Sequence, residues 1–158
     1  MRYWLMKSEP DTYGIDDLIA AGKPAMWEGC RNYTVRNFFR DEMSDGDMAF
    51  FHHSNASPSG IIGTMRIVGD AYPDPTQFDP NSHYFDPKSP KDNPRWLLRD
   101  VDFVEKFPRL VSLAEMKTIP GLEDMWVLRK GMRLSVMPVT EKEWKIIHKV
   151  AKEAAAES

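Results

Sequence analysis

Short strand-like runs alternate with short helical runs along this chain, and neither is long enough to build repeating strand–helix–strand units. The strand-like runs are 2–7, 48–54, 61–68, 95–104 and 133–139. The helical runs are 14–21, 31–42, a short one that begins at 112 and a C-terminal one after 140. No Gly-x-Gly-x-x-Gly follows a strand, so a Rossmann fold is not expected. The pattern predicts a mixed α+β fold, a curled β-barrel flanked by short helices.

Two helix starts carry the capping-box pattern, in which Ser or Thr precedes Glu by three residues. The boxes occupy 112–115 and 140–143, and such pairs satisfy free backbone N–H groups in the first helical turn. After the second box, Trp144, Ile147 and Val150 follow a helical spacing. We expect these three side chains to pack the last helix against the sheet.

The composition limits the kind of partner. The 158 residues suit a single domain, 1–158, and carry 21 Lys and Arg against 24 Asp and Glu, a net charge of −3. Nucleic-acid binding would therefore need a local basic patch. The single cysteine, Cys30, fits a reducing compartment, the cytoplasm or the nucleus of a eukaryote. No run of about 20 apolar residues predicts a membrane span.

Two segments carry polar and flat side chains that could meet at one point. The first strand ends at Ser8 and Glu9, and a turn from Trp27 to Tyr33 follows about twenty residues later. A Trp ring can stack on a nucleobase, and a Glu carboxylate can accept a hydrogen bond from the amino group of cytosine. Core packing is the alternative for the Trp. We predict one cleft, with Trp27 as a ring face and Glu9 and Asn32 as contacts to the edge of the ring.

A helix start near residue 32 brings basic side chains to the same region. Arg31 and Arg36 could hold a phosphate there, because helix N-termini favour anions. Solvated arginines and a capping role for Asn32 are the alternative. Lys88 and Tyr84 lie in a proline-rich stretch that predicts a long ordered loop, and we expect them to close the cleft. Arg31, Arg36 and Lys88 are predicted to form a basic patch, beside a pocket that also admits ring-bearing or anionic small molecules.

Adjacent histidines raise the question of a metal site. His52 and His53 should point to opposite faces of a strand, and His83 has no metal-ligand spacing to either. We therefore predict no metal and no cofactor. Arg31 could lower the pKa of Cys30, although a small buried thiol is the more common case.

The order of these motifs resembles that of the EVE domain family, which has many small bacterial members. The matching stretches are 3–10, 15–18, 27–33, 36–38, 51–54, 60–63, 79–88, 94–96 and 131–136, and they cover nearly the whole chain. The resemblance implies a PUA-like fold related to YTH and ASCH domains. It also implies a pocket for a modified, flipped-out base, most often a modified cytosine such as 5-methylcytosine, in DNA or RNA.

The resemblance implies a set of ligand-binding residues as well. The family-typical positions in this chain are Trp4, Ser8, Glu9, Trp27, Arg31, Asn32, Tyr33, Arg36, His53, Ser54, Tyr84, Lys88 and Ser135. Cys30 departs from the family, which commonly has Val there. The leading hypothesis is a binding module without catalytic activity. The alternatives are an enzyme acting on a nucleotide or modified base, with Glu9 or a histidine as general acid or base, and a small-metabolite sensor.

Overall fold

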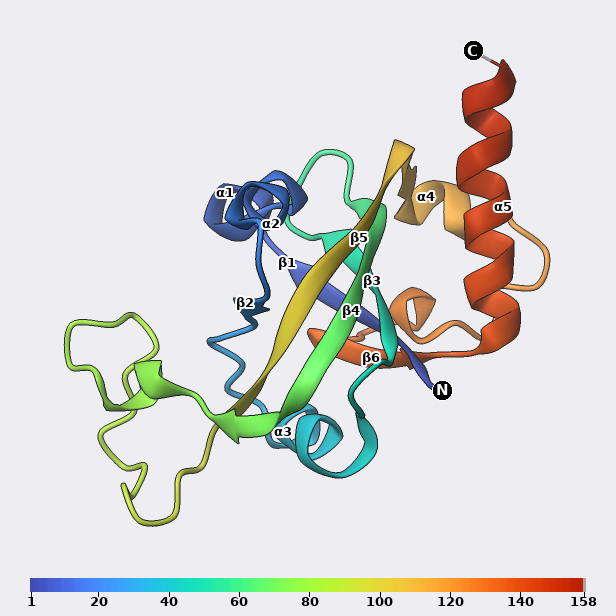
Figure 1. Ribbon diagram of the computed structural model, residues 1–158. Coiled ribbons are helices and arrows are strands. Elements are labelled where there is room, and N and C mark those ends of the chain that lie inside the picture. Colours follow the sequence, from blue (N-terminus) through green and yellow to red (C-terminus); the bar gives the residue numbers. More distant parts are fainter. Residues whose placement is uncertain (158) are drawn as a thin grey trace.

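The computed structural model describes residues 1–157, with side chains through Glu153, as a six-stranded sheet with helices on both sides (Figure 1). The strands are β1 (Tyr3–Ser8), β2 (Ala25–Met26), β3 (Met48–His53), β4 (Gly60–Pro73), β5 (Leu97–Ser112) and β6 (Val136–Val139). Their order in the sheet is β2-β5-β4-β3-β1-β6. β1 and β3 run parallel, and the other paired strands in the described part are antiparallel.

The mixed α+β class is confirmed, but the expected barrel is not. Among the described strands, β2 pairs with β5 and β6 pairs with β1, so these two strands are the open edges of the sheet. The register of β4 against β5 shifts at three places. Such bulges increase the twist of long strands, and β4 and β5 form a long twisted ribbon through the centre of the molecule (Figure 1).

The helices are mostly single turns that connect strands. They are α1 (Pro10–Tyr13), α2 (Ile15–Ala21), α3 (Tyr33–Asn37), α4 (Leu113–Met116) and α5 (Glu141–Glu157), with a π-helical turn η1 (Phe38–Glu42) and 3-10 turns η2 (Pro75–Phe78) and η3 (Trp126–Leu128). The run at 14–21 forms α2, which ends at Gly22 in the left-handed conformation (φ 63°). The run at 31–42 divides into α3 and η1. No helix among residues 1–157 has the length and apolar character that crossing a membrane requires.

β1 separates two hydrophobic clusters, because side chains of a strand alternate between its faces. Trp4 and Met6 belong to one cluster, with Phe51 of β3, and Leu5 belongs to the other, with Phe50. The β1–β3 pairing aligns the two alternations, since Leu5 lies opposite Phe50. The sheet is therefore buried on both faces at its centre.

Helix α5 covers the second cluster (Figure 1). Trp144, Ile147 and Val150 all pack against it, as the sequence predicted. The Thr140 hydroxyl accepts a hydrogen bond from Glu143 N at 3.1 Å, and Thr140 N donates to the Glu143 carboxylate at 2.9 Å. The packing face and the capping box are both confirmed.

Backbone hydrogen bonds bring three segments together where β1 ends. Ser54 N donates to the carbonyl oxygen of Ser8 at 3.0 Å, and Lys7 N donates to that of Ser135 at 2.7 Å. Ser135 precedes β6, which is shorter than the predicted run 133–139. The ends of β1 and β3 and the residues before β6 therefore lie beside one another.

Candidate functional site

A cavity of about 960 Å³ opens beside the end of β1. Its walls come from the end of β1 with α1, from the turn at 26–31 and from the segment 132–135. The predicted binding residues that line it are Ser8, Glu9, Trp27, Arg31, Ser54, Tyr84 and Ser135. The strand end and the Trp27 turn meet at one cleft, as expected; ligand binding by these side chains stays a prediction.

Short hydrogen bonds order the rim of the cavity. The Ser8 hydroxyl donates to the carbonyl oxygen of Tyr13 at 2.6 Å, and Asn55 Nδ2 donates to Glu9 Oε1 at 2.6 Å. Within the described part of the chain this is the one hydrogen bond of the Glu9 carboxylate. A carboxylate has about four acceptor sites, so Glu9 keeps capacity for a ligand.

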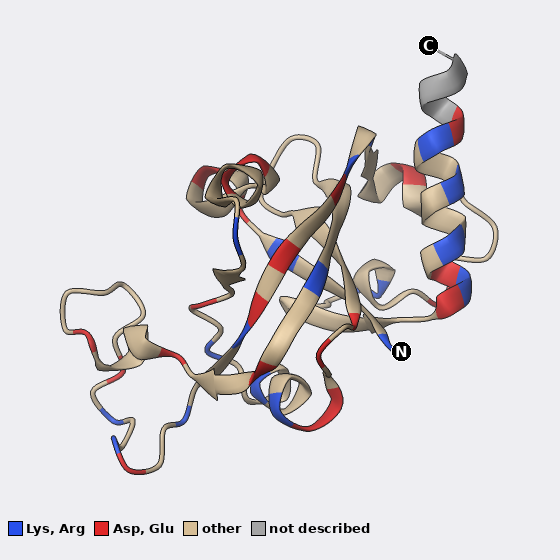
Figure 2. Ribbon diagram, in the orientation of Figure 1, with Lys and Arg blue, Asp and Glu red and all other residues tan. Residues whose placement is uncertain are grey.

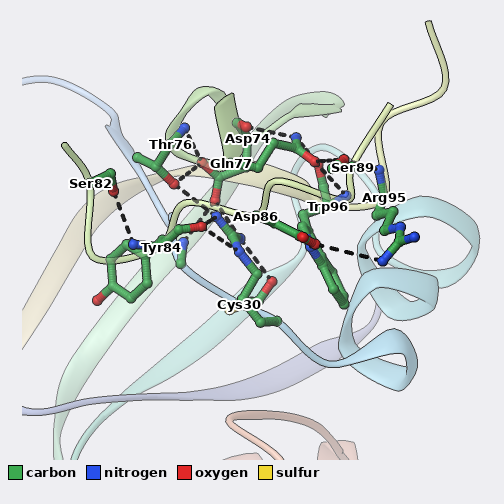
Figure 3. Close-up of polar contacts among 12 residues, drawn as sticks. Cys30, Asp74, Thr76, Gln77, Ser82, Tyr84, Asp86, Ser89, Arg95 and Trp96 are labelled. Carbon is green, nitrogen blue, oxygen red and sulfur yellow. Dashed lines mark hydrogen bonds and ion pairs between the residues drawn. The ribbon is translucent and has the colours of Figure 1, made fainter. Parts of the chain in front are cut away.

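The guanidinium of Arg31 ties the turn to the long loop. It donates to the Asp74 carboxylate at 3.1 Å, to the Thr76 hydroxyl at 3.0 Å and to the Tyr84 carbonyl oxygen at 2.8 and 3.1 Å. Figure 3 labels these three partners. The Asp74 side chain is fully buried. Burial alone would raise the pKa of Asp74, but hydrogen bonds from Gly29, Thr76 and Arg31 outweigh it and hold this pKa below its usual range.

The predicted basic patch is therefore corrected, because the guanidinium of Arg31 is paired with groups of the protein itself. Its charge is balanced by Asp74, 43 residues away in sequence. Arg36 instead lies with its guanidinium over the Tyr33 ring, 4.7 Å from the ring centre. Lys88 is exposed on the loop and does not line the cavity.

Tyr84 forms one wall of the cavity because its ring packs on Gly29. Gly29 has a φ of +88°, and a Cβ at this position would lie 2.6 Å from the Tyr84 ring. Any other residue would meet both backbone strain and the ring. The glycine of the Trp-Glu-Gly turn thus allows the loop to close against the turn.

Trp27 belongs to the hydrophobic core as well as to the cavity lining. It is 7 % exposed, and its ring meets Phe51 edge-on with centroids 5.3 Å apart. The predicted ring lines the cavity, but it is mostly buried and presents only a small surface there.

The remaining predicted binding residues do not line the cavity: Trp4, Asn32, Tyr33, Arg36, His53 and Lys88. Trp4 is buried and donates from Nε1 to a buried carboxylate at 3.1 Å. Asn32 caps α3 by accepting from Val35 N at 3.1 Å, and His53 accepts from Ile15 N at 3.2 Å. The predicted edge contact from Asn32 is therefore corrected to helix capping.

Several lining residues were not predicted to bind. They are Lys7, Thr12, Tyr13, Met26, Glu28, Gly29, Cys30, His83, Met132, Arg133 and Leu134. Met132 and Leu134 lie within three residues of Ser135, so the family match over 131–136 could have identified them. Tyr13 and His83 reach the cavity only through the packing of α1 and the long loop, and no local pattern signals this.

Burial shifts the pKa of two ionisable groups in the cavity wall, Lys7 and Glu28, against their charged forms. It lowers the pKa of Lys7, and it raises the pKa of Glu28, with a further rise from Asp74 and an opposing effect of Arg31. Walls of this kind suit an uncharged polar ring better than an anion.

Cys30 is a protonated thiol in the cavity wall, with Sγ 3.8 Å from the Ser135 hydroxyl. Burial raises the pKa of Cys30 to about 11, while the hydrogen bond with Ser135 and the charge of Arg31 act in the opposite direction. The charge of Arg31 does act to lower this pKa, as suggested, but burial outweighs it and the net shift is upward. The site therefore offers no activated cysteine nucleophile.

We expect Cys30 to alkylate slowly in the folded protein near neutral pH. Because the thiolate is the reactive form and the pKa is about 11, the rate with iodoacetamide should rise about tenfold per pH unit up to that value. The denatured chain, as the control, should level off above about pH 8.5. Mass spectrometry of the intact protein follows the reaction, and a plateau near pH 8.5 in the folded protein would contradict the assignment.

His52 is buried in β3, and neither ring nitrogen has a hydrogen-bond partner among the described residues. Burial, followed by the charges of Lys7 and His53, lowers the pKa of His52 to about 3. The ring is therefore neutral under ordinary conditions. In the part of the chain that the structure describes, no three His, Cys, Asp or Glu side chains gather where a metal ion could bind.

Known proteins are similar to this chain in both sequence and fold. A family model described as the EVE domain matches residues 2–150. Thymocyte nuclear protein 1 of Homo sapiens is 43% identical over 163 residues, which cover 92% of this chain and 72% of that protein. A protein from Pseudomonas syringae superposes with a TM-score of 0.90 at 46% identity, covering 94% of this chain and 99% of its own. The structure of human THYN1 protein in complex with 5-methylcytosine containing DNA has a TM-score of 0.89 at 40% identity, covering 96% of this chain and 98% of its own.

Proposed function

The chain belongs to the EVE domain family, and we propose that it is a binding module for a modified, flipped-out cytosine, 5-methylcytosine first of all, in DNA. The human relative solved with 5-methylcytosine containing DNA supports DNA as the first partner to test, and RNA is the second. We assign the cavity no catalytic step. Such a module would act where nucleic acid is, in the cytoplasm of a bacterium or the nucleus of a eukaryote.

One observation carries this proposal: aromatic, polar and apolar side chains from distant segments line a single cavity. A flipped base loses stacking and pairing at a cost of a few kcal/mol, and contact with Trp27 and Tyr84 would recover part of it. Glu9 would accept a hydrogen bond from the amino group of cytosine. Met132 and Leu134 would surround a methyl group.

The charge distribution agrees with recognition by a pocket instead of by a basic face. Basic and acidic residues are interspersed over the molecule (Figure 2), and the net charge is −3. Of the three residues of the predicted basic patch, Arg31 is paired to Asp74, so Arg36 and Lys88 remain for phosphate contact. A few such contacts make affinity depend only weakly on salt.

We expect the protein to bind an oligonucleotide with one 5-methylcytosine about fourfold or more tightly than the same oligonucleotide with cytosine. Burial of one methyl group contributes about 0.8 kcal/mol, which corresponds to about fourfold in affinity. Fluorescence anisotropy at one stated salt concentration, with single- and double-stranded DNA and RNA, measures the difference. Equal affinity for methylated and unmethylated forms in all four would contradict the proposal.

Two variants test whether the cavity is responsible. Glu9→Gln should reduce the affinity for the methylated strand, because it removes a charged acceptor from the rim. Glu153→Gln, on α5 and outside the cavity lining, should leave affinity unchanged. Free 5-methyldeoxycytidine that binds as tightly as the oligonucleotide would favour a metabolite sensor instead.

A further inference from the structure

A second, smaller cavity adjoins the first one. It measures about 460 Å³ and shares Gly29, Arg31, His83 and Tyr84 with the larger cavity. Its own lining adds Phe85, Asp86 and Trp96. The two cavities are therefore neighbours that share part of their lining, which we call the shared wall.

Flat groups lie side by side at the smaller cavity. The guanidinium carbon of Arg31 lies 5.7 Å from the ring centres of both Tyr84 and Trp96. Trp96 in turn packs on Tyr33, with centroids 4.8 Å apart and planes inclined by 32°. Figure 3 shows Tyr84 and Trp96 on two sides of the hydrogen-bonded centre of this group.

Internal hydrogen bonds hold this wall in place. Trp96 Nε1 donates to the Asp86 carboxylate at 2.7 Å, and Trp96 N donates to Gln77 Oε1 at 3.1 Å. Arg31 is fixed by Asp74 and by the Tyr84 carbonyl oxygen. A planar ligand would meet a preformed surface, which lowers the entropy lost on binding.

Phe85 is an exposed aromatic residue in the lining of the second cavity. It is 40% exposed, whereas Trp96 is 6% exposed. An aromatic ring left open next to a fixed aromatic and guanidinium wall matches the stacking surfaces that hold unpaired bases. The carboxylate of Asp86 in the same lining disfavours an anionic occupant, so a neutral ring suits the cavity better than a phosphate does.

We propose that the second cavity holds the base adjacent to the modified one, so that the protein reads two consecutive nucleotides. The proposal rests on the proposed function of the larger cavity. The continuity of the nucleic-acid strand identifies the occupant. When one flipped base lies in the larger cavity, the strand passes the shared wall and its next base can stack at Phe85. The subsite would give affinity with little base preference, since every base has a π-face.

The test uses single-stranded DNA that contains one 5-methylcytosine and an abasic site on its 5′ or its 3′ side. We expect one of the two abasic positions to weaken binding to the wild-type protein about fivefold or more, as the loss of one stacked base does. Phe85→Ala should weaken binding to the intact strand by a similar factor, and the sensitive abasic site should then cost less than about twofold more. Fluorescence anisotropy measures the affinity of the wild type and of Phe85→Ala for the intact strand and for the strand with the sensitive abasic site.

Two controls separate this subsite from the larger cavity. Val104→Ala removes a side chain of similar exposure, 47%, that lines neither cavity, and it should change nothing. 5-Methyldeoxycytidine monophosphate should bind wild type and Phe85→Ala equally. Indifference of the wild type to both abasic positions, with preference for the methylated strand retained, would overturn the subsite alone. Loss of that preference in the wild type would overturn the proposed function.

Discussion

Arg31→Ala is expected to destabilise the fold by about 3 kcal/mol or more, because it leaves a buried carboxylate without its cation. Asp74 is fully buried and would keep only neutral donors, from Gly29 and Thr76. The Tyr84 carbonyl oxygen would also lose both hydrogen bonds from the guanidinium. The free energy of unfolding, from a denaturant titration at neutral pH, measures the effect.

The loss of unfolding free energy caused by Arg31→Ala should depend on pH. The pKa of Asp74 in the folded protein is below its usual value. Ionised Asp74 therefore contributes stability above the unfolded pKa of about 3.9, and the contribution is lost as pH falls through the folded pKa. The difference in unfolding free energy between wild type and Arg31→Ala should be largest near neutral pH. It should shrink in acid, where protonated Asp74 no longer needs a cation.

Arg66→Ala is the matched control for this ion pair. Arg66 and Asp102 are 3.7 Å apart, with side chains 54% and 36% exposed. A solvated pair of this kind contributes less than about 1 kcal/mol. Equal costs for the two variants, or a cost of Arg31→Ala that does not change with pH, would show that Asp74 does not depend on Arg31.

Trp27→Ala is expected to cost about 3–5 kcal/mol of folding stability, as the loss of a large buried aromatic side chain does. Trp27 is 7% exposed and packs in the first hydrophobic cluster. An exposed ring face that only stacks on a ligand would instead cost about 1–3 kcal/mol in ligand binding and leave the fold intact. Since domains are stable by about 5–15 kcal/mol, the stability loss should dominate, and denaturant unfolding should report it.

Tyr33→Ala controls for the loss of an aromatic ring as such. Tyr33 is 51% exposed and does not line the larger cavity. Its contact with Trp96 contributes about 1 kcal/mol or less. Binding by Trp27→Ala must be measured where the variant is still folded. A cost for Trp27→Ala no greater than that for Tyr33→Ala would contradict the core position of Trp27.

The sequence by itself determined several of the elements and part of the core, but not β2, α1 or the full length of β5. The capping box at 140–143 and the helical spacing of Trp144, Ile147 and Val150 predicted α5 and its packing face. Such signals are readable because caps and periodicity depend on residues three or four apart. The convergence of Ser8 with the Trp27 turn was also predicted, because the end of a strand delivers its side chains to one edge of a sheet.

The roles of individual side chains were decided only by the tertiary structure. Arg31 has the same local signature whether it holds a phosphate or a carboxylate, and its partner Asp74 lies 43 residues away. Asn32 suits a cap or a ligand equally well, and the structure uses it as the cap of α3. The long loop brings Tyr84 onto Gly29 and so builds the wall between two cavities. A polar or charged group can be buried at low free-energy cost only when it is paired, and its partner is often distant in the sequence. Local sequence patterns do not show which distant group that partner will be.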